Sequence, residues 1–378
     1  MHDVIVVGGG PVGLYTALLL RQAGLDAVVL ERRTERSNHS RAIGIHPPAL
    51  RALAAGGIAD ELRARGVPIR DGVARSAGRH VGTVSFSTLP GSDQYVLAVP
   101  QAVTEEILER RLQEQFPGTL RRGVAVLTTR DDGDRVLAVT RGPGGDATLE
   151  ARLLVAADGA RSSVRDDAGI RAPRRSYPDC YVMGDFQDST QDGDDAVLYL
   201  ETGGIVESFP LPGGVRRWVV RIGRPMDRPT AEDLTRLIRN RTGVTVDPRT
   251  NSMLSAFEVQ SRVAERFVAG RTVLVGDAAH EVSPIGGQGM NLGWLDAVRL
   301  APIIAASLRD GHDVAGRLAL YERERHAQAA LARRKAHINM ALGRPLPAPV
   351  MRFRNAVLGA LIRNDAVHGG VARAFTMQ

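Results

Sequence analysis

Two glycine-rich turns, one near the N-terminus and one far downstream, constrain the fold of this chain more than any other feature. The first turn follows the apolar run of VIVVGGGPVG and places Gly8, Gly10 and Gly13 in the spacing G-x-G-x-x-G. Glycines at this spacing permit a tight turn from a strand into a helix. They also let the backbone approach a pyrophosphate, whose charge the helix N-terminus then meets. The chain is therefore expected to begin with a βαβ unit that binds a dinucleotide.

The residues around the first turn support that unit. Their composition predicts a strand over 4–7, a helix over 12–23 and a second strand over 27–30. Glu31 closes the second strand about 20 residues after the turn, where an acid can hold a ribose hydroxyl. The spacing of the glycines is weak evidence alone, but strand, turn, helix and acid together indicate a nucleotide site. They do not distinguish a nicotinamide from a flavin.

The composition excludes several other classes of protein. The chain has 378 residues and is 43% hydrophobic, enough for a sizeable core in two domains or in one elaborated by insertions. Its net charge of +7 is scattered among acids, so we expect no nucleic-acid site. Cys180 is the single cysteine, which excludes an internal disulfide and fits a cytoplasmic location. No membrane span, targeting segment or metal cluster is expected.

The remaining chain divides by its patterns. Helices are expected over 49–65 and 104–115, the latter capped by its first residue, and three strands over 124–130, 136–141 and 147–154. Residues 181–222 show short strands of an antiparallel kind, separated by Gly, Asp and Pro. Residues 311–378 are predicted to be mostly helical. The fold class is therefore α/β, with a second sheet inserted into a Rossmann-like domain.

Two further motifs narrow the cofactor. LLVAADGARSSVR places Asp158 after an apolar strand, followed by Arg161 and Arg165, and TVLVGDAAHEVSPIGGQGMN places Gly276 and Asp277 at another strand end. With the first turn, in this order, the three motifs resemble those of the class A FAD-dependent monooxygenases of the para-hydroxybenzoate hydroxylase type, and among these the aromatic and polyketide hydroxylases. The resemblance covers nearly the whole chain.

The resemblance implies a division into domains and a set of cofactor residues. It implies a GR2-type FAD-binding domain at 1–75, 96–170 and 262–310, a substrate-binding β-sheet domain at 76–95 and 171–261, and a C-terminal helical segment at 311–378. The residues implied for FAD are Gly8, Gly10, Gly13, Glu31, Arg41, Gln101, Asp158, Gly276, Asp277, Pro284, Gly287, Gly289, Met290 and Asn291. NADPH or NADH is expected at Asp158, Arg161 and Arg165.

The resemblance also implies a reaction. NAD(P)H reduces FAD, O2 gives a flavin C4a-hydroperoxide, and the distal oxygen is transferred to an aromatic substrate, phenolic or polyketide-like. Pro284 would border the flavin ring, and the helix opening near Met290 would stabilise negative charge on the reduced ring through its N–H groups. This division of labour explains the second glycine turn, since the ring needs a cradle separate from that of the phosphates.

Several candidate residues keep two interpretations. His46 could act on a phenol proton or be a hydrogen-bonded structural histidine, and His280 is expected to support the motif beside it. Aromatic side chains at Tyr181, Phe209 and Trp218 lie on predicted strands of the inserted sheet and could face a flat substrate or pack in the core.

Alternative functions also stay open. A Baeyer–Villiger oxygenase or an epoxidase on a polyketide-like substrate would use the same fold, and so would a flavin-binding protein without turnover. A tryptophan-type halogenase is disfavoured because its Trp-x-Trp-x-Ile-Pro motif is missing and the sole lysine, Lys335, lies late in the chain. The expected partners are a small aromatic molecule and O2, and the chain could be a monomer or a homodimer.

Overall fold

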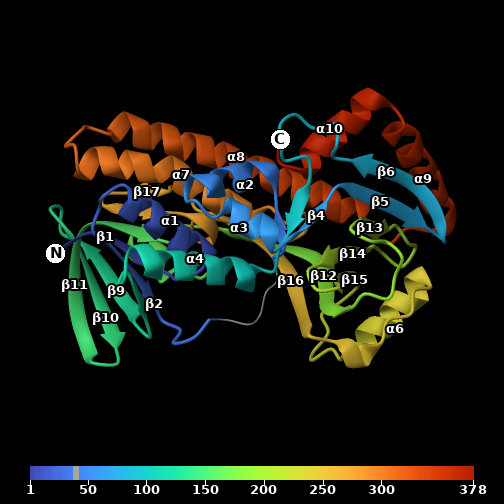
Figure 1. Ribbon diagram of the computed structural model, residues 1–378, viewed down its shortest axis with the longest axis horizontal. Helices are drawn as coiled ribbons and strands as arrows, with labels where there is room; N and C mark the ends of the chain where they lie inside the picture. Colours follow the sequence, from blue (N-terminus) through green and yellow to red (C-terminus); the bar gives the residue numbers. More distant parts are fainter. Residues whose placement is uncertain (37–41) are drawn as a thin grey trace.

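The structure is a computed structural model that describes residues 1–36 and 42–378. One half of the molecule is built around a sheet with parallel central strands, called here the first sheet (Figure 1). The strand order is β17-β18-β11-β1-β2-β8, and β10 and β9 extend from β11 as an antiparallel meander. The members are β1 (His2–Val7), β2 (Ala27–Glu31), β8 (Leu120–Arg122), β9 (Ala125–Asp131), β10 (Val136–Gly142), β11 (Gly145–Ala156), β17 (Val268–Ala269) and β18 (Thr272–Leu274).

Strand β1 forms the centre of this sheet. It pairs in parallel with both β2 and β11, so that Val6 lies between Val29 and Val155. Val4, Ile5 and Val6 have no exposed surface. A continuous β-branched run is typical of a strand buried on both faces of a parallel sheet. The βαβ unit expected from the first glycine turn is confirmed.

Helices cover the first sheet and carry its glycine turns. They are α1 (Pro11–Gln22), α2 (Pro47–Ala55), α3 (Ala59–Ala64), α4 (Gln101–Gln115), α5 (Ser163–Asp167) and α7 (Gly289–Leu308), with a short 3-10 turn, η2, at Gly276–Ala278.

Two of these helices differ from the sequence prediction. The single helix expected over 49–65 is two helices, because the chain turns at Gly56 and Gly57, the latter with φ of +73°. Helix α4 begins at Gln101 rather than at Thr104, whose hydroxyl is buried and caps nothing.

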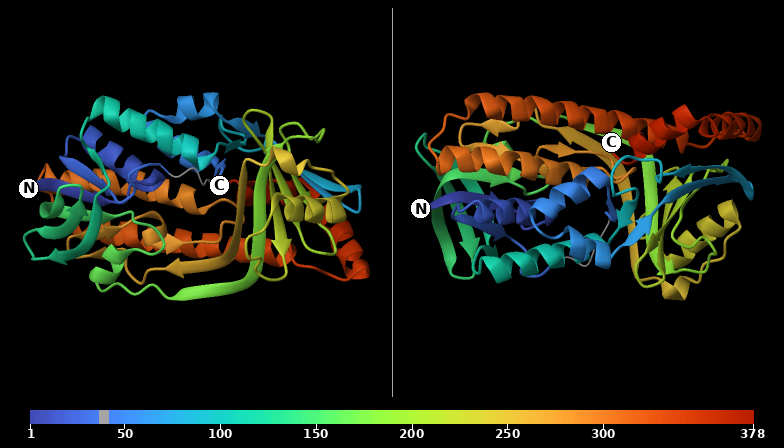
Figure 2. Two further views of the ribbon diagram at one scale, coloured as in Figure 1. Left: turned by 90° about the horizontal axis from the view of Figure 1, so that it is seen from below. Right: turned by 45° about the horizontal axis from the view of Figure 1, so that its top comes forward.

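The other half of the molecule holds a second sheet, with strand order β19-β16-β12-β15-β14-β13-β5-β6. Its strands are β5 (Asp71–Ser76), β6 (Arg79–Ser85), β12 (Arg174–Gln187), β13 (Ala196–Tyr199), β14 (Val206–Leu211), β15 (Val215–Ile222), β16 (Met253–Val263) and β19 (His280–Glu281). The long strands β12 and β16 run between the two halves (Figure 2). Because β5 pairs with β13, we place the start of this domain at Asp71 rather than at residue 76.

The second sheet has two differently covered faces. On the face called here the inner face, Tyr181, Met183 and Val219 pack in one cluster with Ile285, which lies in the second glycine-rich turn. On the opposite, outer face, Val182 and Trp218 pack beneath helix α6 (Ala231–Thr242). A 3-10 turn, η1 (Pro248–Thr250), follows α6. Alternation along the strands thus directs one set of side chains toward the glycine turns and the other away from them.

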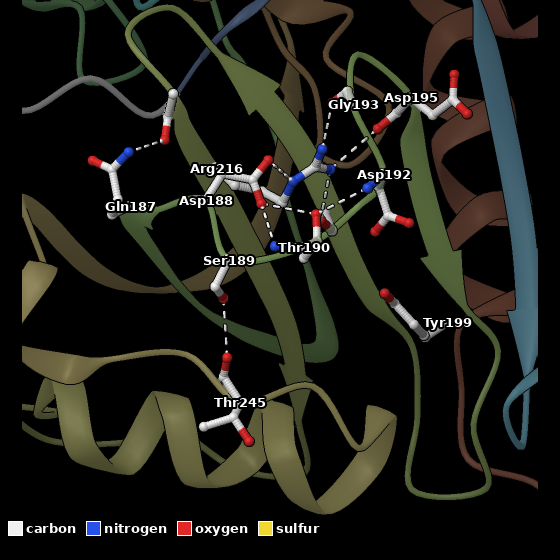
Figure 3. Close-up of polar contacts among 12 residues, drawn as sticks. Gln187, Asp188, Ser189, Thr190, Asp192, Gly193, Asp195, Tyr199, Arg216 and Thr245 are labelled. Carbon is white, nitrogen blue, oxygen red and sulfur yellow. Dashed lines mark hydrogen bonds and ion pairs between the residues drawn. The ribbon is translucent and has the colours of Figure 1, made fainter.

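The loop between β12 and β13 is fixed by a buried arginine. Arg216 has no exposed side-chain surface and donates to Asp188 Oδ2 at 2.9 Å, to the Gly193 carbonyl at 2.6 Å and to the Asp195 carbonyl at 3.1 Å (Figure 3). Its guanidinium therefore ties the loop to β15, in addition to backbone hydrogen bonds such as that from the Asp188 N–H to the Gly214 carbonyl at 2.8 Å.

Three helices close the chain, namely α8 (Ala315–Leu342), α9 (Ala348–Ile362) and α10 (Asp365–Phe375). Helix α8 runs along the top of the molecule in Figure 1, and α9 and α10 lie beside β6. A small third sheet of β3 (Gly44–Ile45), β7 (Val96–Ala98) and β4 (Val67–Ile69) lies between the halves. Of the helices in the described ranges, none combines the length and the apolar character that a membrane crossing requires.

Candidate functional site

The first glycine turn is built by close backbone packing. A Cβ added to Gly8, where φ is +107°, would lie 2.4 Å from the Ala157 carbonyl oxygen, and one added to Gly13 would lie 2.0 Å from that of Gly8. In contrast, nothing lies within 4 Å of a Cβ built on Gly10. Gly10 is also the N-cap of α1, and no side chain caps that helix. The turn is therefore tightly packed at Gly8 and Gly13 and open at Gly10. The open side faces the uncapped N–H groups at the start of α1.

Glu31 stands at the edge of this open space. Its carboxylate accepts hydrogen bonds from the Gly9 N–H at 2.7 Å and from the backbone and side chain of Arg33 at 2.9 and 3.0 Å. Burial would by itself raise the pKa of Glu31, but these hydrogen bonds offset it and lower the pKa below its usual value. The group is ionised at neutral pH and can accept a further hydrogen bond from a hydroxyl.

The second motif lies against the first turn. Asp158 follows Ala157, the residue that Gly8 contacts, and its Oδ2 accepts from the Val164 N–H at 3.3 Å. Its Oδ1 is buried and has no partner among the described residues, and burial raises the pKa of the group. A buried carboxylate oxygen without a donor is costly, so this one fits a ligand hydroxyl or N–H.

The two arginines of the second motif have different surroundings. Arg161 is exposed. Arg165 is buried and donates to the carbonyls of Ala160 at 3.2 Å and Ala278 at 3.3 Å. Arg165 therefore ties the second motif to the third and is not placed to meet a nicotinamide phosphate.

The third motif packs directly on the first turn. A Cβ on Gly276 would lie 3.3 Å from the Val12 side chain, and one on Gly293, in α7, would lie 2.4 Å from it. The start of α1, the Gly276 turn and the first turns of α7 therefore meet at Val12, although they are far apart in sequence. The close contact leaves no room for a Cβ at Gly293, and the φ of +59° favours glycine at Gly276.

Asp277 lines the space beside that meeting point. Its side chain is exposed to solvent. The surrounding protein nevertheless desolvates the carboxyl and raises its pKa to about 6, with the positive charge of His280 opposing the shift. The carboxyl is therefore accessible to a ligand although neighbouring protein atoms partly desolvate it.

A buried network holds the third motif in place. Asp296 of α7 accepts from His280 at 2.6 Å, from the Gly276 N–H at 2.9 Å and from Arg325 of α8 at 2.5 Å. His280 therefore has the supporting role that the sequence suggested. Asp296 and Arg325 were not found from the sequence, because they come from helices whose local patterns show only helical composition.

The second glycine-rich turn, between Pro284 and Asn291, is braced from β3. The Asn291 amide donates to the carbonyls of Gly44 at 2.9 Å and Gly287 at 2.7 Å and accepts from the His46 N–H at 2.8 Å. Pro284 is exposed. Asn291 therefore shapes the turn from within, and Pro284 presents its surface. Gly289 opens α7, and Met290 is packed partly into the core.

His46 also supports the second glycine-rich turn. Its Nε2 lies 3.2 Å from the Gly286 carbonyl oxygen, and the ring is buried. Burial lowers the pKa of His46 to about 4, and the Gly286 carbonyl only partly opposes this. The ring is neutral at pH 7 and donates from Nε2, which favours the structural interpretation over a role as proton acceptor.

Gln101 and Arg41 are the two residues expected near the phosphates and the ribityl chain of the cofactor. Gln101 begins α4 and donates to Glu105 at 2.8 Å. Arg41 lies outside the described residues.

The aromatic candidates divide between the faces of the second sheet. Tyr181 has no exposed surface and stacks on Phe257 with ring centroids 5.6 Å apart, and Phe209 is half-buried in the same inner-face cluster. Trp218 stacks on Tyr199 on the outer face. Trp218 therefore does not share a surface with Tyr181 and Phe209, because neighbouring register positions point to opposite sides.

A cavity of about 600 Å³ lies on the outer side of the second sheet, between the β12–β13 loop and the residues after α6. Tyr199 and Thr245, which Figure 3 labels, are in its wall. None of the expected site residues lines it.

Comparisons with known proteins identify the family and the fold. The model of the family described as FAD binding domain matches residues 1–336. Rifampicin monooxygenase of Streptomyces venezuelae is 34% identical over 364 residues, which cover 93% of this chain and 74% of that protein. Among solved structures, p-nitrophenol 4-monooxygenase from Pseudomonas putida DLL-E4 has a TM-score of 0.89 at 27% identity, covering 100% of this chain and 98% of that one. OxyS anhydrotetracycline hydroxylase from Streptomyces rimosus has a TM-score of 0.82 at 31% identity, covering 100% and 76%.

Proposed function

The chain belongs to the FAD binding domain family, and from that premise we propose that its substrate is a flat, hydroxylated aromatic compound of the phenolic or polyketide kind. It is an FAD-dependent monooxygenase that hydroxylates aromatic substrates with O2 and a nicotinamide reductant. The relatives it resembles are named for rifampicin, anhydrotetracycline and p-nitrophenol, which range from large to single-ring aromatic compounds.

The residues present fit FAD. Free N–H groups and open space stand above Gly10, which suits a pyrophosphate, and the ionised Glu31 beside them suits a ribose. The orphaned Asp158 Oδ1 and the accessible Asp277 carboxyl offer acceptors for further hydroxyls. We propose that these four residues hold the cofactor and that Pro284 borders its ring.

The observation that carries this proposal is the meeting of the start of α1, the Gly276 turn and the first turns of α7 at Val12. The start of α1 would hold the phosphates of the cofactor, and Asp277 and the Pro284 turn would hold the remainder of it. When bound, FAD supplies electron transfer from the nicotinamide and activation of O2. The start of α7 has no side-chain cap, so its N–H groups are available to stabilise negative charge near the ring.

The protein's own residues position the substrate and exclude water. The inner face of the second sheet packs against Ile285 of the Pro284 turn, so a substrate between them would lie beside the ring site. Phe209 contributes a half-buried aromatic surface there, whereas Tyr181 has no exposed surface. For the reductant, we propose the exposed Arg161 as a contact of the NAD(P)H phosphates, since Arg165 is occupied.

The test is direct. Purified protein should retain FAD, be reduced by NADPH or NADH under anaerobic conditions, and convert a phenolic substrate into a product with one added oxygen when labelled O2 is admitted. Mass spectrometry identifies the label and its position. A product with oxygen inserted into a ring would show that the reaction is a Baeyer–Villiger oxidation and not a hydroxylation. A protein that binds FAD but is inert to both nicotinamides would contradict the proposed turnover.

A further inference from the structure

Glu207 is a buried carboxyl group without a partner. It lies in β14 with 8% of its surface exposed and makes no hydrogen bond or ion pair with any residue in the described ranges. The other buried charged side chains of the second sheet are paired. They are Asp179, Asp185, Arg216, Arg217, Arg221 and His280. Glu207 is therefore an exception within its own sheet.

The register places Glu207 on the inner face. It is opposite Val219 of β15 on one side and Leu198 of β13 on the other. Val219 and Leu198 both belong to the cluster that contains Ile285 of the Pro284 turn, and so does Phe209, two residues after Glu207. The carboxyl is thus framed by apolar side chains on the face that looks toward the ring site.

An apolar frame is a costly place for a lone carboxylate. Burial alone raises the pKa of Glu207 to about 7, and no neighbouring cation opposes the shift. Among the charged groups of this face, Arg217 is paired with Asp185 and Arg221 with Asp179.

Other titratable groups near Glu207 do not compensate it. The hydroxyl of Tyr181 has no partner in the described residues, and the charge of Glu207 helps to raise its pKa. His46, behind the facing turn, is neutral at pH 7. Arg344, which follows α8, is engaged with Asp179.

We propose that Glu207 binds a hydroxyl group of the aromatic substrate and accepts its proton, and that it selects neutral hydroxyarenes over carboxylated ones. The inference rests on the proposed function. In the step, the substrate O–H bond breaks and an O–H bond forms on the Glu207 carboxylate, while the negative charge passes to the substrate oxygen. No oxidant or reductant is consumed. The resulting phenolate is richer in electrons and so more reactive toward oxygen transfer.

The same residue explains selectivity. A neutral hydroxyl satisfies the lone carboxylate, whereas a substrate carboxylate at this position would place two negative charges in an apolar frame. The nearby arginines already serve aspartates, so they are not placed to neutralise such a substrate. A carboxyl whose pKa lies near neutral pH is also a stronger base than an ordinary one.

Three two-ring probes test the proposal, namely 2-naphthol, its methyl ether 2-methoxynaphthalene, and 2-naphthoate. Their dissociation constants are measured by the perturbation of the bound FAD spectrum in the wild type and in Glu207→Leu, Glu207→Gln and the control Glu258→Gln. Glu258 lies in the same sheet but is exposed. We expect the wild type to prefer the naphthol to the ether by at least tenfold and to reject the naphthoate. Glu207→Leu should abolish that preference, and the control should keep it.

The Gln variant separates hydrogen bonding from proton transfer. Glu207→Gln can still accept a hydrogen bond but not a proton, so it should keep part of the naphthol affinity. In the wild type, the preference for the naphthol should rise as the pH rises through about 7, because only the ionised carboxylate accepts fully. In the variant it should be independent of pH over that range. Retention of FAD by every variant shows that the fold survives.

The outcomes distinguish the two claims. If Glu207→Leu keeps the hydroxyl preference, if the wild type favours the ether or the naphthoate, or if it binds none of the probes, the assignment of Glu207 is wrong and the monooxygenase proposal is untouched. If the hydroxyl preference depends on Glu207 but labelled oxygen enters no aromatic substrate, the proposed function fails and the binding role of Glu207 stands.

Discussion

The half of the molecule built on the first sheet and the half built on the second sheet differ in what constrains their side chains. Around the first glycine turn, the difficulty is steric, and it is solved by leaving out side chains, so that Gly13 approaches the Gly8 carbonyl and Gly10 faces open space. In the second sheet, the difficulty is electrostatic, since many charged side chains are buried and nearly all are paired across strands. At the sites we propose, backbone N–H groups and three carboxylates would meet the cofactor, whereas the substrate would meet the side chains of the second sheet, so that substrate specificity can change while the cofactor site is kept.

The strongest test of the electrostatic half removes Asp179. Its carboxylate is fully buried and accepts from Arg221 at 2.9 Å and from Arg344 at 2.7 Å. Asp179→Ala leaves two guanidinium groups without their partner and should destabilise the fold by about 3–5 kcal/mol. Thermal or urea unfolding measures the loss. Asp194→Ala, at an exposed position, is the control and should unfold like the wild type. An equal Tm for both variants would show that this pairing does not stabilise the sheet.

The contacts of Asp179 with its two arginines also predict that stability depends on pH. Burial would raise the pKa of Asp179, but the hydrogen bonds from Arg344 and Arg221 outweigh it and lower the pKa below the usual value. A depressed pKa contributes stability above the ordinary pKa of an aspartate, and this contribution is lost as the pH falls through the folded value. The difference in stability between wild type and Asp179→Ala should therefore shrink in acid.

The next test concerns the close backbone packing of the first glycine turn. A Cβ at Gly13 would overlap the Gly8 carbonyl, so Gly13→Ala should cost about 3 kcal/mol and release FAD. Gly10→Ala is the matched control, because its φ of −80° suits alanine and no atom lies within 4 Å of its Cβ. Its stability without FAD should change by less than about 0.5 kcal/mol. Its affinity for FAD should nevertheless fall, since the methyl group enters the proposed phosphate space. Calorimetry of the apoprotein and FAD titration separate the two effects.

A smaller effect is expected at Glu207, the buried charged side chain of the second sheet that has no partner among the described residues. Glu207→Leu removes an unpaired buried carboxyl and should stabilise the free protein by about 1–2 kcal/mol at pH 8. Because burial raises the pKa of Glu207 from an ordinary value of about 4.5 to about 7, the folded state binds the proton more tightly than the unfolded state. The wild type therefore loses stability between these pH values, and the gain from the variant should diminish toward pH 5. A gain that is equal at both pH values would contradict the raised pKa.

The smallest effect concerns a buried hydroxyl of the first half. Thr104 of α4 is fully buried, and its Oγ1 has no partner among the described residues. Thr104→Val keeps the shape and removes the unpaired group, so we expect a gain of about 0.5–1 kcal/mol in the free energy of unfolding. Thr230→Val is the contrasting variant. Its hydroxyl caps α6 by accepting from the Asp233 N–H, and its loss should cost about 1 kcal/mol.

By itself, the sequence determined the βαβ unit, the inserted sheet and the C-terminal helices, and it indicated the three motifs at which we propose that the cofactor binds. These features follow from local causes, such as β-branched runs, glycine spacing and a polar residue at a strand end, which act over a few neighbouring residues. The same locality explains the errors. Periodicity continued through Gly56 and Gly57, and Thr104 had the composition of a cap in a helix that begins earlier.

Only the tertiary structure decided which side chains are occupied and which are available. Arg165 and Asn291 fit their motifs, yet their hydrogen bonds bind distant parts of the protein to one another. Trp218 and Phe209 are both aromatic residues on predicted strands, but the register of the strands places them on opposite faces of the sheet. Glu207 is distinguished only by having no partner, and a missing partner can be seen only when every strand that could supply one is in place.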